Sequence, residues 1–188
     1  MFAAHAEPLM ILRVLIFVAS SIALVLIFAS TKPKTFRIER SIIIDSPPDR
    51  VFALIDNLGN WPRWAPQDRE DPSMKRTYSG PANGKGAVSN WTGSGSSGRG
   101  GMLITESAPP RKVCVQVDWV KPFVARNVNE FVLEGTGTST KVTWTMHGPN
   151  LYLMRIMGVF VNMDRMMGKH FERGLDNLKT LAEKDPTG

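Results

Sequence analysis

The chain contains little cysteine and little histidine, which excludes several kinds of site. Cys114 is the only cysteine among 188 residues, so no disulfide can form within the chain and a cysteine-rich zinc site is excluded. The three histidines, His5, His147 and His170, are widely spaced. We therefore expect neither a metal site nor a cofactor.

The length and composition limit the class of protein. A chain of 188 residues is too short for separate cofactor and substrate lobes, and 43% hydrophobic residues are too many for a disordered protein. The net charge is +6, but the basic residues are scattered and no recognised nucleic-acid-binding motif is present. We expect one ordinary domain with an appendage, and no nucleic-acid partner.

The appendage is a long apolar segment, residues 9–30, in which Arg13 is the only charged residue. A helix of roughly 20 residues spans a hydrocarbon core of about 30 Å. A retained transmembrane anchor over residues 1–31 is therefore the favoured interpretation. A cleaved signal peptide is an alternative, although Phe28 is a poor residue three positions before a cleavage at Thr31. A buried core helix is the third alternative.

The charges that flank this segment predict its orientation. Lys32, Lys34, Arg37 and Arg40 follow it, whereas few positive charges precede it. Because positively charged flanks stay in the cytoplasm, we expect a single-pass membrane protein whose main domain, residues 32–188, is cytoplasmic.

Apolar residues alternate with polar ones over much of the main domain, which indicates half-buried strands. The set Val142, Trp144 and Met146 is the clearest. Turn signals rich in glycine and proline separate these segments, and a helix start is expected at Asp45–Asp49. About seven short strands predict one antiparallel sheet. Apolar residues at three- and four-residue steps predict a single long helix from Leu151 to Glu183.

The chain resembles the SRPBCC group of the START-like superfamily, which includes proteins of the polyketide cyclase/dehydrase type, and in particular its membrane-anchored bacterial members. The resemblance covers about residues 36–183. The residues that carry it are Arg40–Ile42, Ile44–Pro47, Trp61–Pro66, Asp71, Pro72, Met74, Gly80, Gly84, Gly86, Trp91, Gly93, Gly100–Met102, Lys121–Phe123, Thr140–Trp144, Gly168–Phe171, Gly174, Leu175 and Leu178.

This resemblance implies the α+β helix-grip fold, in which a curved antiparallel sheet wraps around the C-terminal helix with a hydrophobic cavity between them. Strand parity and helix spacing then give candidate cavity-lining residues, although each of them could instead fill a solid core. The candidates are Trp91, Trp119, Asn129, Phe131, Trp144, Met146, Met157, Phe160, Met163, Asp164, Met167 and Phe171.

Trp61 and Trp64 lie in a short connector after the first helix of the domain. Exposed tryptophans on a loop are typical of ligand contact, so the pair is a candidate gate. The alternatives are packing at one end of the domain and contact with the membrane interface.

Few polar residues share a face with the apolar strand positions. Asn127 and Asn129 share the face of Phe131, and Glu106 shares the face of Met102. A carboxylate in an apolar cavity, such as Glu106 or Asp164, would have a raised pKa and could act as an acid or base. The alternative places each in solvent or in an ion pair.

Three hypotheses for function follow. The first is membrane-anchored binding of a small hydrophobic ligand or lipid in the cavity. The second is an enzyme of the polyketide cyclase or dehydratase kind that uses a buried carboxylate. The third is a ligand-free interaction module whose contact surface is Trp61 and Trp64, or the segment 151–163. That segment could lie on the membrane or be buried under the sheet.

Overall fold

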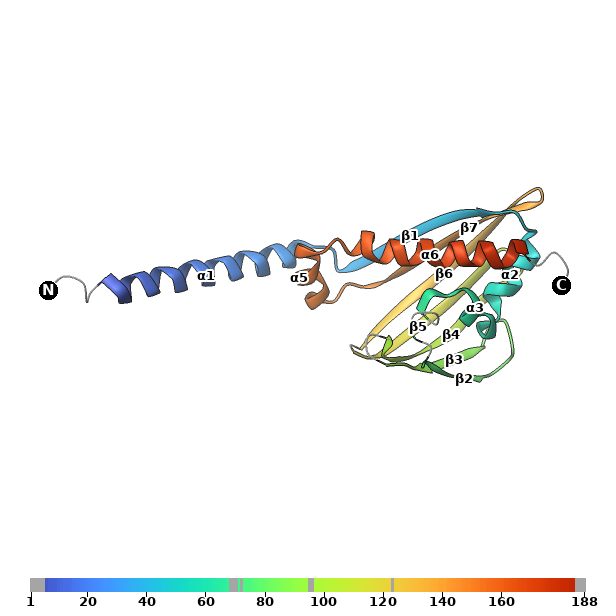
Figure 1. Cartoon of the computed structure of the whole chain (residues 1–188), viewed down its shortest axis with the longest axis horizontal. Coiled ribbons are helices and arrows are strands. Elements are labelled where there is room, and N and C mark those ends of the chain that lie inside the picture. The colour runs from blue at the N-terminus through green and yellow to red at the C-terminus, as the bar shows by residue number, and fades with distance from the viewer. Residues whose placement is uncertain (1–5, 68–70, 72, 95–96, 123, 185–188) are drawn as a thin grey trace. The chain divides into compact units, whose positions relative to one another are not determined.

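The computed structural model describes residues 6–67, 71, 73–94, 97–122 and 124–184 (Figure 1). Three residues named above, His5, Pro72 and Phe123, lie outside these ranges. The chain divides into two compact units. One comprises the segments 1–34 and 150–163, and the other comprises 35–149 and 164–188.

The first unit contains two helices, α1 (Ala6–Thr31) and α5 (Tyr152–Phe160). Within α1, the 23 residues Leu9–Thr31 have a mean hydropathy of 2.7 and most of their apolar side chains are exposed. A helix of this length and composition can cross a membrane. The expected apolar N-terminal helix is thus confirmed.

The second unit is built on one antiparallel sheet of seven strands in the order β1-β7-β6-β5-β4-β3-β2. The strands are β1 (Thr35–Ile44), β2 (Lys75–Ser79), β3 (Val88–Thr92), β4 (Arg99–Ala108), β5 (Lys112–Lys121), β6 (Ala125–Thr136) and β7 (Ser139–Pro149). This arrangement confirms the seven-stranded antiparallel sheet. It follows from the strand alternation together with the hairpin turns.

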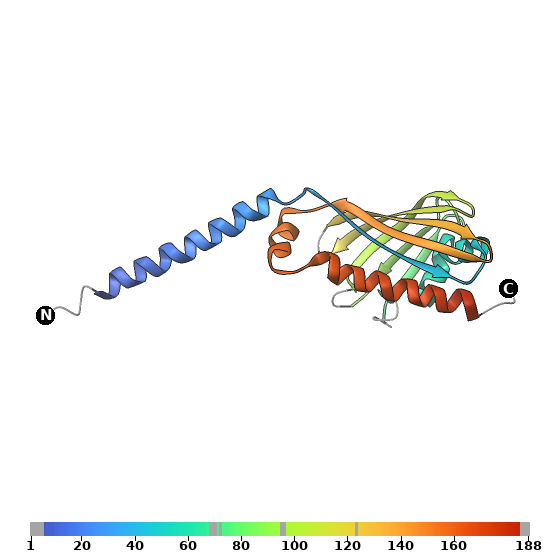
Figure 2. The same ribbon diagram turned by 90° about the horizontal axis from the view of Figure 1, so that it is seen from above.

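One face of the sheet, here called the inner face, carries the helices of the second unit. They are α2 (Pro48–Asp56), η1 (Leu58–Asn60), α3 (Trp61–Trp64) and α6 (Met163–Lys184). Figure 2 shows α6, in red, lying along the sheet. Its stripe of Phe171, Leu175 and Leu178 is buried in the core with Trp144 and Val115 of the inner face. The predicted helix-grip fold is confirmed.

The prediction of a single helix over residues 151–183 is wrong. The chain forms α5 and then α6, and between them Val161 has extended backbone angles of φ −123° and ψ 131°. The apolar spacing continues through the break, so periodicity alone does not reveal it. The available signal is Asn162 followed by Asp164, because asparagine favours the position before a helix and acidic residues favour its first turn.

Two glycines allow α6 to approach the sheet closely. The stacked rings of Trp144 and Phe171 lie 4.2 Å apart between their centroids. A Cβ atom on Gly174 would lie 2.8 Å from Cζ3 of Trp144, and a Cβ atom on Gly168 would collide with the guanidinium of Arg40. Any larger residue at either position must therefore push the helix or its neighbours aside.

Asp71 ties the segment before β2 to the segment after β3. Its Oδ1 accepts hydrogen bonds from the backbone N–H and the hydroxyl of Ser73, at 3.1 and 2.5 Å, and its Oδ2 accepts one from the backbone N–H of Ser94 at 2.7 Å. These bonds, led by the Ser73 hydroxyl, lower the pKa of Asp71 to about 2. The ionised carboxylate is thus the form that holds the two segments together.

Replacing Gly174 should test the close approach of α6. We expect Gly174→Val to lower the free energy of unfolding by about 1–3 kcal/mol, because the added carbons overpack the core at the Trp144 ring. Lys169→Val is the control, since Lys169 is exposed on the same helix. Thermal unfolding followed by near-ultraviolet circular dichroism measures both. Equal stability of the two variants would contradict this account of the packing.

The low pKa of Asp71 predicts how stability depends on acid. Its folded pKa of about 2 lies below the ordinary aspartate value of about 3.9. Its contribution should therefore be fully present above pH 4 and disappear as the pH falls toward 2. We expect Asp71→Asn to be less stable than the wild type at pH 7 and to lose less stability over that acid range. Denaturant unfolding across the range measures this, and parallel curves would refute it.

Candidate ligand-binding site

Five aromatic rings form a continuous cluster between the sheet and the helices. Each ring lies within 6.1 Å of a neighbour, measured between centroids, and most of the contacts are edge-to-face or tilted. Edge-to-face and offset contacts are the favoured aromatic geometries. The members of this aromatic cluster are Trp61, Trp64, Phe131, Trp144 and Phe171. All five side chains are buried, so this part of the interior is filled by packed rings.

Trp61 and Trp64 are not exposed, as a gate on a loop would require. Both side chains are buried in the aromatic cluster. Their indole N–H groups donate to the backbone carbonyls of Ile55 at 2.9 Å and Leu54 at 3.3 Å. The segment forms η1 and α3 rather than a loop, because the two rings pack inward on the sheet side. This geometry supports the packing alternative.

A second aromatic pair lies further along the inner face. Trp91 and Trp119 meet edge-to-face with centroids 5.1 Å apart, and the indole of Trp91 donates to the carbonyl of Ser97 at 3.0 Å. The ring of Trp91 lies directly against Gly100, where a Cβ atom would collide with it. Trp91 is fully buried, whereas Trp119 is only partly covered.

Asn129 is a buried polar residue on the inner face, as its parity predicts. On the neighbouring strands its register partners are Val115 and Met146. Its Oδ1 accepts a hydrogen bond from the indole of Trp144 at 2.8 Å. No other hydrogen bond of Asn129 is found within the described residues, and its amide carries two further N–H donors. Asn127 lies two residues away on the same face and is half-buried.

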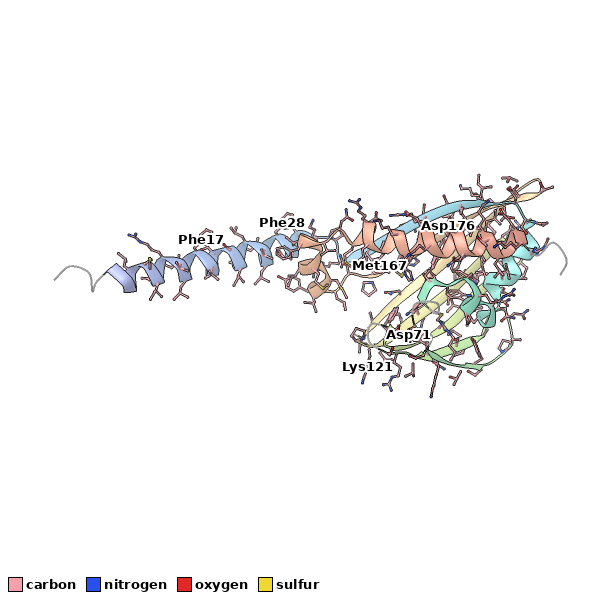
Figure 3. The ribbon with its side chains drawn as sticks, in the orientation of Figure 1. Phe17, Phe28, Asp71, Lys121, Met167 and Asp176 are labelled. Atoms are coloured by element: carbon pink, nitrogen blue, oxygen red, sulfur yellow. The ribbon has the colours of Figure 1, made fainter. Side chains whose placement is uncertain are left out.

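The methionines and phenylalanine expected on the C-terminal helix separate into two groups. Met167 lies on α6, one turn before Phe171, and packs half-buried against the core (Figure 3). Met157 and Phe160 belong to α5 and are exposed at 40% and 73%. Met163 is half-buried at the start of α6. Of these four, only Met167 packs against the core, which includes Val115 and Met146, the register partners of Asn129.

Asp164 does not face the interior, contrary to its place in the helical stripe. Its exposed carboxylate accepts a hydrogen bond from Nη2 of Arg40 at 3.1 Å, and Nε of Arg40 donates to Glu172 at 2.8 Å. Arg40 has the same parity as Ile38 on β1, and its guanidinium lies beneath Gly168. Sequence reasoning overlooked Arg40 in this role, although its parity was the available signal. The ion pair fastens α6 to the edge strand.

Glu106 also lies away from the interior. A register irregularity between Ile104 and Glu106 inserts an extra residue into β4, and such a bulge reverses the parity that follows it. Glu106 therefore stands on the outer face, where Lys112 donates to it at 3.0 Å. Cys114, the register partner of Glu106, is also on this face, with its sulfur 3.5 Å from the Glu106 carboxylate.

The outer-face groups have pKa values that do not suit catalysis of the expected kind. The hydrogen bond from Lys112 holds the pKa of Glu106 below its usual range. Burial raises the pKa of the Cys114 thiol to about 11. Glu106 is thus an ionised carboxylate at neutral pH, and Cys114 is a protonated thiol rather than a nucleophile.

A pocket of about 270 Å³ lies elsewhere in the second unit, beside η1 and the β2–β3 hairpin. None of the residues predicted to line a cavity contributes to it, and its lining includes no carboxylate, histidine or lysine. The residues around it are Asn57, Leu58, Gly59, Tyr78, Ser79, Gly80, Pro81, Ala82, Ala87 and Val88. The predicted cavity-lining residues thus lie apart from this pocket, and the polar residue buried among them is Asn129.

Solved structures share this fold at low sequence identity. Protein CV1439 from Chromobacterium violaceum has a TM-score of 0.57 at 14% identity, covering 82% of this chain and 100% of that one. The Aha1 dimer from Colwellia psychrerythraea has a TM-score of 0.53 at 19% identity, with coverages of 81% and 99%. The di-domain ARO/CYC StfQ from the steffimycin biosynthetic pathway has a TM-score of 0.59 at 10% identity. The match covers 80% of this chain and 51% of that one.

A comparison with curated proteins finds no match. The family model described as "Polyketide cyclase / dehydrase and lipid transport" matches residues 35–183. This range contains the whole sheet and nearly all of α6, and the match supports the SRPBCC/START-like resemblance. The chain therefore belongs to the polyketide cyclase/dehydrase and lipid transport family.

Proposed function

We propose that this protein binds a small hydrophobic ligand or lipid on the inner face, between the sheet and α6, while α1 holds it in a membrane. The observation that carries the proposal is Asn129, a buried residue of the inner face whose Oδ1 accepts from Trp144 and whose N–H groups make no hydrogen bond within the described residues. Half-covered apolar side chains, Met167 and Trp119, lie at the edge of the same core. An apolar site with a few placed polar groups is typical of small-molecule binding.

Binding is better supported than proton-transfer catalysis. Acid–base chemistry in the cavity requires a carboxylate or another titratable group within reach of the substrate. The two carboxylates that the sequence offers for this role do not meet that requirement. Glu106 lies on the outer face beside Lys112, and Asp164 is exposed and paired with Arg40.

The retained anchor is supported by contacts inside the first unit. The hydroxyl of Tyr152 in α5 donates to the carbonyl of Leu26 in α1 at 2.9 Å, and Arg155 donates to the carbonyl of Ser30 at 3.4 Å. A signal peptide that is removed would leave α5 without these partners. The basic residues that follow α1, including Lys32 and Lys34, favour a cytoplasmic domain. Such an anchor keeps the domain at the bilayer, where apolar ligands concentrate.

Charging the inner face should remove the ligand. We expect full-length protein, purified gently in detergent from its native host, to carry a compound that Met167→Arg no longer carries. A guanidinium at this half-buried position would place a charge against the apolar face. Solvent extraction and untargeted mass spectrometry identify the compound and its amount per mole of protein.

Met166→Arg is the matched control, because Met166 is exposed on the same helix. Bulk lipids that copurify with α1 should be the same in the wild type, Met167→Arg and Met166→Arg. The specific compound should be lost only from Met167→Arg. Met167→Trp, which fills the same space without a charge, should reduce the amount if the arginine variant does not fold. An empty extract from all folded proteins would refute ligand binding and favour the interaction module.

The amide of Asn129 should contribute to affinity. Asn129→Leu removes both amide N–H donors without placing a charge on the inner face. We expect the extracted compound to bind this variant roughly tenfold more weakly, which corresponds to the loss of one hydrogen bond. Isothermal titration calorimetry measures the affinity, and near-ultraviolet circular dichroism checks the fold. Unchanged affinity in a folded variant would remove Asn129 from the site.

A further inference from the structure

One side of α5 is fixed against the end of α1. Tyr152 and Arg155 make the two hydrogen bonds to the carbonyls of Leu26 and Ser30. The guanidinium of Arg155 also lies over the ring of Tyr152, 5.0 Å from its centroid. Three residues apart on a helix, these two side chains point to the same side. The side of α5 that faces α1 is thus defined.

Another stripe of α5 is apolar and uncovered. Leu153, Met157 and Phe160 follow one another at steps of four and three residues, and their exposed fractions are 55%, 40% and 73%. No residue of α5 is buried. A stripe of this kind on a helix of a water-soluble protein normally faces a core. Nothing in the described part of the chain covers it here.

The hydrogen bonds to α1 also set the depth of α5. Leu26 lies five residues before Thr31, where the apolar span ends, which is about 7.5 Å along the helix axis. α5 therefore lies beside the last turns of the span. This is the boundary between acyl chains and headgroups, where tyrosine and arginine are favoured because each has an apolar body and a polar end.

We infer that α5 is an interfacial membrane helix, with its stripe of Leu153, Met157 and Phe160 immersed in the phospholipid bilayer that α1 crosses. The inference rests on the proposed anchoring by α1 and adds a second lipid contact far away in the sequence. Lys32 and Lys34 just beyond the span, together with Arg155, favour anionic headgroups at this surface. An amphipathic helix with large apolar residues on one side binds a bilayer in this manner.

The chain connections give this contact a structural consequence. α5 directly joins the end of β7 to the start of α6. The residues at which the chain enters β1 and leaves β7, Thr35 and Pro149, are partners in the sheet register. The domain is thus tethered through α1 and also through the helix that leads into α6.

Site-directed spin labelling of the full chain tests the inference. The protein is reconstituted in bilayers of phosphatidylcholine and phosphatidylglycerol, with Cys114→Ser to remove the native thiol. Single labels are placed by Met157→Cys and Phe160→Cys. Phe17→Cys in α1 is the lipid control and Asp176→Cys on the exposed side of α6 is the aqueous control (Figure 3). The ratio of relaxation by oxygen to relaxation by a nickel chelate reports immersion in lipid.

We expect oxygen to dominate at positions 17, 157 and 160, and the nickel chelate to dominate at position 176. Should positions 157 and 160 resemble position 176 while position 17 remains in lipid, the interfacial helix is refuted and the anchor stands. An aqueous signal at position 17 would overturn the proposed anchor and the interfacial helix together. Leu153→Cys gives an independent label on the same stripe if either variant loses its native circular dichroism.

Discussion

The second unit depends on how closely α6 can approach the sheet. Trp144 stacks on Phe171 with nearly parallel rings, and this contact is available only because Gly174 offers no side chain at the edge of the indole. A turn and a half earlier, Gly168 leaves room for the guanidinium of Arg40, which is held by two carboxylates of the same helix. Close packing in one place and an ion pair in the other fix both the depth and the direction of the helix.

This fixed helix divides the inner face into two regions of different character. Around Phe171 the aromatic side chains contact one another, and Trp61 and Trp64 of α3 pack against Phe131, with Trp64 also meeting Trp144. One turn toward the start of α6, Met167 is less covered than Phe171. On the sheet, the register partners Asn129 and Met146 carry no aromatic ring. Methionine adapts to irregular shapes because it is unbranched and flexible. The aromatic region supplies stability, and the second region is the one in which a ligand is proposed.

Much of this architecture could be predicted from the sequence, because burial on one face of a sheet has a period of two. That rule correctly placed Trp144, Met146 and Asn129 on the inner face. It failed at Glu106, because a single bulge in β4 reverses the parity of the residues that follow it. The alternation of apolar and polar residues in the sequence does not reveal the bulge. Helical spacing did not predict the break at Val161, because the apolar residues of α5 and α6 continue the same three- and four-residue steps across it. The parity of Arg40 indicates its face, but its partners Asp164 and Glu172 are far away in the sequence, and no local pattern identifies them.

The distribution of charge limits what the proposed site can recognise. Two sets of charged groups in the second unit are already paired: Arg40 with Asp164 and Glu172, and, on the outer face, Lys112 with Glu106 and Glu130. A fully charged ligand buried on this face would therefore find no counter-ion among these groups, and its desolvation would cost several kcal/mol. The amide of Asn129 can instead donate to a neutral oxygen at little cost. These constraints favour a ligand with an apolar body and a carbonyl or hydroxyl oxygen, a chemistry that partitions into the bilayer in which α1 is proposed to anchor the domain.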